Sequence, residues 1–134
     1  MHAFARILPI ACLALLVGCG GKVLPFAGDR VKADVILEGE MTTVEASANP
    51  HSEAGVKYLR TEDWKKAVDE LKLARQEEPD DMRTAFALGV AYEKSAMYKE
   101  ALESYQAANQ LAGKTGRAPI TAAVLRMKEK TGSK

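Results

Sequence analysis

A repeat at a constant offset of 34 residues constrains the fold of this chain more than any other feature. The segment 50–113 contains two copies of one pattern, aligned without a gap. A period of this length predicts two copies of one supersecondary unit that bury apolar surface by stacking on each other. The residues that recur in phase are Gly55/Gly89, Val56/Val90, Tyr58/Tyr92, Trp64/Tyr98, Lys65/Lys99, Ala67/Ala101, Leu71/Tyr105, Ala74/Ala108 and Gln76/Gln110.

The order of small and large residues in each copy predicts a pair of antiparallel helices. A glycine inside a helix costs about 1 kcal/mol relative to alanine, so its presence at the same phase in both copies indicates a packing requirement. We expect Gly55 to face Ala67 and Gly89 to face Ala101, with the large residues filling the space around them. Pro79 is expected to end the first unit, because proline cannot continue a helix.

The period and the order of small and aromatic residues resemble the tetratricopeptide repeat family. The resemblance implies an all-α solenoid of two helix-turn-helix units over 50–113, followed by a capping helix and tail over 114–134. Two positions depart from the family pattern: Ala96 stands where a turn glycine is common, and His51 stands where a large apolar residue is usual. The helices are expected at 51–60, 63–77, 81–94, 98–111 and 119–130.

The N-terminal segment 1–18 predicts an export signal. A short start with one arginine precedes an apolar run over 7–17, which is shorter than the roughly 20 residues that a membrane-spanning helix needs. The run ends in residues 16–19, LVGC, which resemble the lipobox of bacterial lipoproteins. The resemblance implies cleavage before Cys19 and attachment of a palmitate-containing lipid to that residue. The alternative is an ordinary secretory signal cut at a small residue nearby.

The residue after Cys19 and the cysteine count bear on where such a protein resides. Gly20 follows the cysteine. In many Gram-negative lipoproteins an aspartate there retains the protein at the inner membrane, so the resemblance implies the outer membrane, facing the periplasm. Cys12, the other of the 2 cysteines, lies inside the predicted signal. The mature chain is therefore expected to contain no disulfide, although its compartment permits them.

The segment 19–49 is expected to form a lipid-anchored tether and an arm. It opens with two glycines and contains Pro25, which suit a tether. From 31 to 44 the composition turns towards strand, and Gly39 is placed for the turn of a short β-hairpin, which would need a surface to lie on. An extended arm is the favoured interpretation and the hairpin is the alternative. In either form, the apolar residues of the arm can pack on the repeats.

Composition and motifs argue against nucleic-acid binding, cofactors and catalysis. Lys and Arg number 19 against 18 Asp and Glu, a balance that gives no steering field for nucleic acid. The segment 113–115 lacks the preceding glycine of a phosphate-binding loop, because Ala108 stands there. His51 is the one histidine after the predicted signal, and its neighbour Ser52 has no visible catalytic partner. We expect no metal, no cofactor and no enzymatic activity.

A surface for protein partners remains. By the family resemblance, the first helix of each unit lines the concave side of the solenoid, where segments of partner proteins lie. An alternative interpretation, given the same weight as the partner-binding surface, is that the residues of this face are core or are covered by the arm over 35–44. The spacing i, i+4, i+7 on this face selects Ser52, Val56, Leu59, Phe86, Val90 and Glu93.

The expected function is that of a non-enzymatic binding or assembly lipoprotein of the bacterial cell envelope. It would take a peptide or helix segment of a partner protein on the concave face and reach the membrane through its lipid anchor. The alternative is structural, because two units are few and copies can stack end to end into a longer solenoid.

Overall fold

The computed structural model describes residues 30–113 and 117–133. The predicted signal, the tether and Cys19 lie outside the described residues. The described part is mostly helical, with a small two-stranded antiparallel sheet, so the all-α expectation holds for everything except that sheet. Its elements are β1 (Lys32–Leu37), β2 (Glu40–Glu45), α1 (Pro50–Arg60), α2 (Trp64–Glu77), α3 (Met82–Lys94), α4 (Tyr98–Leu111) and α5 (Arg117–Thr131).

The helix bounds agree with the predicted ones to within two residues at every end. Short polar side chains fix three of the starts by accepting hydrogen bonds from free backbone N–H groups. The Asn49 side chain accepts from the His51 N–H at 2.8 Å at the start of α1. Asp63 caps α2, and Asp81 caps α3 by accepting from the Thr84 N–H at 2.8 Å. Local sequence therefore decides where these helices begin.

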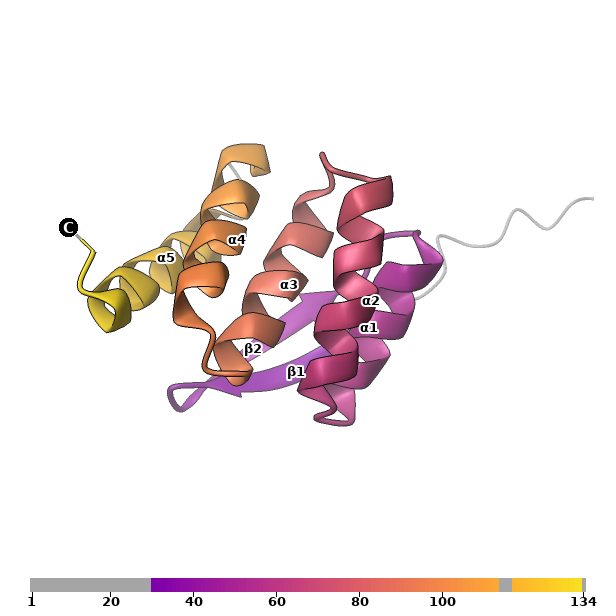
Figure 1. Cartoon of the computed structure of the whole chain (residues 1–134), viewed down its shortest axis with the longest axis horizontal. Coiled ribbons are helices and arrows are strands. Elements are labelled where there is room, and N and C mark those ends of the chain that lie inside the picture. The colour runs from indigo at the N-terminus through magenta and orange to yellow at the C-terminus, as the bar shows by residue number, and fades with distance from the viewer. Residues whose placement is uncertain (1–29, 114–116, 134) are drawn as a thin grey trace, which may run out of the picture.

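The helices pack in chain order, each against the next, from α1 to α5 (Figure 1). The hairpin of β1 and β2 crosses one side of this row, where β1 contacts α1 and β2 contacts α3. A buried apolar core joins the inner side of the hairpin to the helices. The hairpin is therefore part of the same packed body as the two helix pairs.

Large side chains of the following helix lie closest to the two repeated glycines. A Cβ atom on Gly55 would lie 2.4 Å from Leu71 Cγ, and one on Gly89 would lie 2.5 Å from Tyr105 Cδ1. The atoms nearest to the glycines therefore belong to Leu71 and Tyr105 and not to Ala67 and Ala101. Each glycine lets a large side chain from the following helix lie directly on the helix backbone, and the contact recurs at the offset of 34 residues.

The segment 31–46 forms a hairpin, so the favoured extended arm is wrong and its alternative is correct. Gly39 lies in the turn, as the hairpin alternative expected. Glu38 and Gly39 have φ of 50° and 88°, the positive values that a tight two-residue turn of type I′ requires. Side chains alternate along β1, with Val35 and Leu37 buried and Ile36 63% exposed. The surface that the hairpin needs is supplied by α1 and α3.

The turns inside the two units share an unusual backbone conformation. Glu62 and Ala96 stand 34 residues apart, and their φ values are 60° and 59°. Side chains with a Cβ atom are strained in this left-handed region, which glycine enters freely. Ala96 departs from the repeat pattern at the position where the conformation favours glycine.

We predict that Ala96→Gly stabilises the protein. Ala96 is exposed, so the change removes strain of about 1 kcal/mol without deleting a packed side chain. The midpoint of thermal unfolding should rise by about 4–8 °C. The matched control is Ala122→Gly, at an exposed helical position of α5, which should destabilise by about 1 kcal/mol. A lower midpoint for Ala96→Gly would contradict the strain at this turn.

Candidate functional site

The structure buries all six residues predicted to contact a partner. Their exposed fractions are 0% for Ser52, Val56 and Val90, 1% for Leu59, 8% for Glu93 and 9% for Phe86. These residues lie on α1 and α3, the helices that the hairpin crosses. The prediction that they form an open surface is therefore corrected. The alternative in which they are core or are covered by the arm describes what the structure shows.

The polar residue of α1 in this set belongs to a buried hydroxyl cluster. Ser52 Oγ accepts from the Ser47 N–H at 3.0 Å and from Thr84 Oγ1 at 3.2 Å. These bonds join the segment after β2 to α1 and α3. The adjacent His51 instead contacts Glu70, with Nδ1 and Oε2 2.7 Å apart. Ser52 and His51 therefore do not form a nucleophile and base, and Ser52 satisfies buried polar groups.

The acidic residue of the set, Glu93, holds three helices together. Arg126 of α5 donates to both carboxylate oxygens at 2.8 Å, through Nε and Nη2. The Tyr105 hydroxyl of α4 donates to Oε2, also at 2.8 Å. Burial, and then the negative charge of Glu93, raise the pKa of Tyr105 far above its usual range, so the phenol stays protonated. This buried network is arranged to hold α3, α4 and α5 together.

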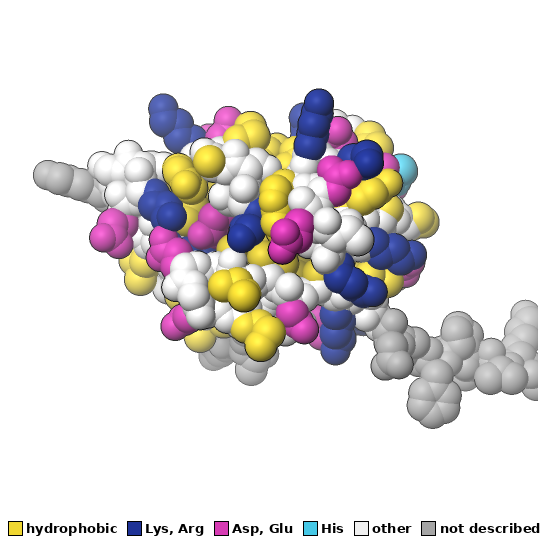
Figure 2. All heavy atoms as spheres, turned by 90° about the horizontal axis from the view of Figure 1, so that it is seen from below, with side chains coloured by type: hydrophobic (Ala, Val, Ile, Leu, Met, Phe, Trp, Pro, Cys, Tyr) yellow, Lys and Arg dark blue, Asp and Glu magenta, His cyan; other side chains and the backbone are white. Residues whose placement is uncertain are grey.

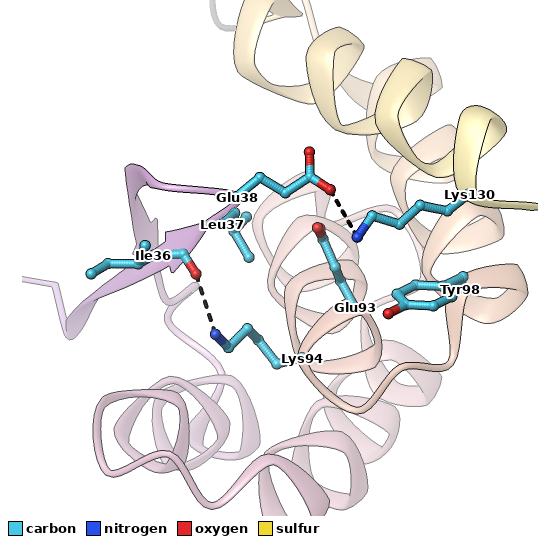
Figure 3. A pocket seen from close by; sticks show the side chains of 7 residues that line it. All are labelled: Ile36, Leu37, Glu38, Glu93, Lys94, Tyr98 and Lys130. Carbon is cyan, nitrogen blue, oxygen red and sulfur yellow. Dashed lines mark hydrogen bonds and ion pairs between the residues drawn. The ribbon is translucent and has the colours of Figure 1, made fainter.

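A cavity of about 190 Å³ lies between the hairpin turn and the C-terminal ends of α3 and α5 (Figure 3). Two lysines reach into it from opposite sides. Lys94 Nζ donates to the Ile36 carbonyl at 3.2 Å, and Lys130 Nζ lies 2.8 Å from the Glu38 carboxylate. The cavity is lined by Ile36, Leu37, Glu38, Glu93, Lys94, Tyr98 and Lys130.

Each of the two amines also lies over an aromatic ring. Lys94 Nζ is 5.1 Å from the centre of the Trp64 ring, and Lys130 Nζ is 4.9 Å from the centre of the Tyr98 ring. The hydrogen bond between Lys130 and Glu38 raises the pKa of Lys130 and lowers the pKa of Glu38. Both groups are therefore charged at neutral pH. The site fastens the hairpin to the helices.

A second groove, of about 290 Å³, lies beside β2. Phe86, one of the six predicted residues, forms part of its wall. Sequence analysis missed this groove because it depends on the hairpin, which was not the favoured interpretation. The groove is lined by Thr43, Glu45, Met82, Arg83, Phe86, Pro119 and Ile120.

Among residues 30–113 and 117–133, no group of three His, Cys, Asp or Glu side chains is arranged to hold a metal ion. No helix in the described part is both long and apolar enough to span a membrane. Figure 2 shows basic and acidic side chains interspersed over one face, with hydrophobic ones between them. That face presents no single sign of charge that would steer nucleic acid.

Comparison with known proteins identifies no relative. No protein-family model, no curated protein and no solved structure matches this chain.

His51 gives the protein a pH-dependent contact between α1 and α2. The hydrogen bond to Glu70 raises the pKa of His51 above its ordinary value of 6.5, and the charge of Glu77, with atoms 3.8 Å apart, acts in the same direction. A raised pKa in the folded state means that the contact stabilises the fold below pH 6.5. This stabilisation is lost as the pH rises through the folded pKa.

We predict that NMR titration of the His51 ring will give a pKa above 6.5. Glu70→Gln should lower that pKa, because it removes the charged acceptor. It should also reduce the decrease in the free energy of unfolding above pH 6.5. Glu103→Gln, at an exposed position of α4, is the control and should leave the titration unchanged. A His51 pKa at or below 6.5 in the unmodified protein would refute the contact.

Proposed function

We propose that this chain is a tetratricopeptide-type module of two units closed by α5. The support is that structural details, as well as residue types, recur at the offset of 34. The glycine contacts Gly55–Leu71 and Gly89–Tyr105 recur, and so do the left-handed turn residues. A third recurrence links the units to the hairpin.

That third recurrence concerns the C-terminal residues of α1 and α3. Arg60 Nη2 donates to the Lys32 carbonyl at 2.6 Å, and Lys94 Nζ donates to the Ile36 carbonyl at 3.2 Å. Arg60 and Lys94 hold the same position in the two units. Each unit therefore uses the same position to donate a hydrogen bond to a carbonyl of β1. The two carbonyls belong to residues four positions apart in the strand.

We infer that the function is non-enzymatic protein binding or assembly. One observation carries this proposal: an extended segment lies across the face that tetratricopeptide modules use for the segments of partners. Here that segment is the hairpin of the chain itself. A partner then binds to the surface that the hairpin and helices form together, and the six buried residues support that surface from below.

The lipobox resemblance supports a position of this module at the bacterial envelope. We propose that lipid on Cys19 anchors it to the outer membrane, with the helical part in the periplasm. Several acyl chains suffice for firm anchoring at about 0.8 kcal/mol per buried methylene. The structural alternative of end-to-end stacking is disfavoured at one end, because α5 covers α4.

We predict that Cys19 carries the lipid. Cells of a bacterial host that express the chain should incorporate a clickable palmitate analogue into it, and Cys19→Ser should abolish the label and release the protein from the membrane fraction. Cys12→Ser is the matched control and should keep both the label and the membrane association, because Cys12 lies in the segment that is removed. Labelled Cys19→Ser protein would contradict the anchor.

We predict that a photo-reactive residue on the surface captures a partner protein in cells of the source bacterium. Suitable exposed positions are Lys72 on α2, Gln106 on α4 and Pro119 on α5. At least one should give an adduct of discrete mass with another protein. An adduct of twice the mass of the chain would instead support self-association. If no position gives an adduct in the lipidated protein, the proposed binding role is wrong.

A further inference from the structure

At alternate residues of each strand, the backbone N–H and C=O groups point away from the other strand of the hairpin. The Ala46 N–H donates to the Val31 carbonyl at 2.8 Å, so this pair is a hydrogen-bonded one. Hydrogen-bonded and non-hydrogen-bonded pairs alternate along an antiparallel ladder. The pair Asp34 and Thr43 is therefore non-hydrogen-bonded, and both residues direct their backbone N–H and C=O groups outward, away from the other strand.

Basic side chains cover part of the outer edge of β1. Its outward carbonyls at Lys32 and Ile36 accept hydrogen bonds from Arg60 and Lys94. On the outer edge of β2, no backbone or side-chain group of the described residues bonds the outward N–H or C=O of Thr43. A row of unpaired backbone groups on an edge strand is a template for pairing with another strand.

The groove beside this edge has the size and lining for a side chain. It holds about 290 Å³ between β2, the first turn of α3 and the first turn of α5. Phe86 and Ile120 form apolar walls, together with Met82 and Pro119. Pockets for small-molecule ligands start at about 300 Å³, so this groove is small for a cofactor and suits an apolar side chain of a bound peptide.

The charge beside the groove indicates what else a bound peptide carries. Glu45 is paired with Lys32 at 3.0 Å. The Arg83 side chain is 38% exposed, and its contact with Glu45 is long, at 3.8 Å. Within the described residues Arg83 makes no hydrogen bond, so its guanidinium retains donors for a carboxylate.

We propose that the outer edge of β2 is a strand-addition site for an extended segment of a partner protein. The segment pairs its backbone with the outward groups around Thr43, places one large apolar side chain in the groove, and presents a carboxylate to Arg83. This proposal rests on the proposed function in one respect, that the chain binds a protein. A second copy of the chain is a poor occupant. Its hairpin is packed on its own helices, and the groove is walled by helices on the same side.

The test uses a proline on each edge as a matched pair. Thr43→Pro removes the outward N–H of β2, and Asp34→Pro removes the outward N–H of β1; neither removes a bond of the ladder. Both variants lose the same side-chain bond, from Thr43 Oγ1 to Asp34 Oδ1 at 2.6 Å. Any difference in partner binding between the two variants therefore reports which strand edge the partner pairs with. Circular dichroism and thermal unfolding are used to check that the two variants are equally folded.

The readout is the adduct from a photo-reactive residue at position 119, at the groove, in the lipidated full-length chain in cells. Thr43→Pro should weaken this adduct about tenfold, through loss of a backbone hydrogen bond and of the pairing around it. Asp34→Pro should leave it unchanged, and Arg83→Glu should weaken it by repelling the carboxylate. Mass spectrometry of the adduct should identify a segment of another protein with an apolar residue near an acidic one.

Every other result overturns the proposal. An adduct at 119 that Thr43→Pro leaves intact, or that both proline variants weaken equally, shows binding without strand addition. An adduct of twice the mass of the chain identifies a second copy as the occupant. Adducts from Lys72 or Gln106 with none from position 119 leave the proposed function standing and place the partner elsewhere. The absence of adducts from every position refutes both proposals.

Discussion

The burial of the apolar side of the hairpin on α1 and α3 is the interaction on which the rest of the structure depends. Val35, Leu37 and Val44 are each less than 5% exposed. Burying an apolar side chain of this size contributes about 1.5–3 kcal/mol. These three together outweigh the exposed hydrogen bonds from Arg60 and Lys94 to backbone carbonyls, each contributing on the order of 1 kcal/mol. Apolar packing holds the hairpin in place, and the basic side chains fix its position along the helices.

The network around Glu93 has a different role, because it fixes the order of the last three helices. The Glu93 side chain is 5% exposed, and a carboxylate buried to this extent is costly unless it is paired; here Arg126 and Tyr105 together supply three hydrogen bonds. An arrangement with α5 displaced would leave the Glu93 charge buried and unpaired. This penalty keeps α5 against α4, and α5 supplies one wall of the groove beside β2.

The repeat in the sequence predicted the helices well, because periodic apolar residues, caps and breakers act locally. It did not predict that Leu71 and Tyr105 lie closest to Gly55 and Gly89. A fixed offset shows that a contact recurs, but which side chain lies on the glycine depends on how the two helices cross. The hairpin turn was predicted only as the alternative, and the usual signal for such a turn, Asn or Asp before glycine, is absent there. Glu38 accepts the left-handed conformation there, and its ion pair with Lys130 adds a tertiary contact.

The candidate site could be predicted only in part, for a related reason. The sequence located the face of α1 and α3, but whether Ser52 and Phe86 meet solvent or protein depends on a segment elsewhere in the chain. The edge of β2 was beyond sequence analysis, because a shift of the hairpin register by one residue reverses which backbone groups point outward.

If the proposed module binds a protein, the hairpin over α1 and α3 changes the kind of recognition it can perform. A bare helical face selects its ligand through side chains, whereas a strand edge offers N–H and C=O groups that any extended sequence can pair with. Selectivity must then come from a few neighbouring positions. In the proposed binding mode, the groove at Phe86 and Ile120 would select for an apolar side chain, and Arg83 would select for a carboxylate. Because Arg60 and Lys94 already bond two outward carbonyls of β1, the proposed recognition uses the β2 edge of the hairpin.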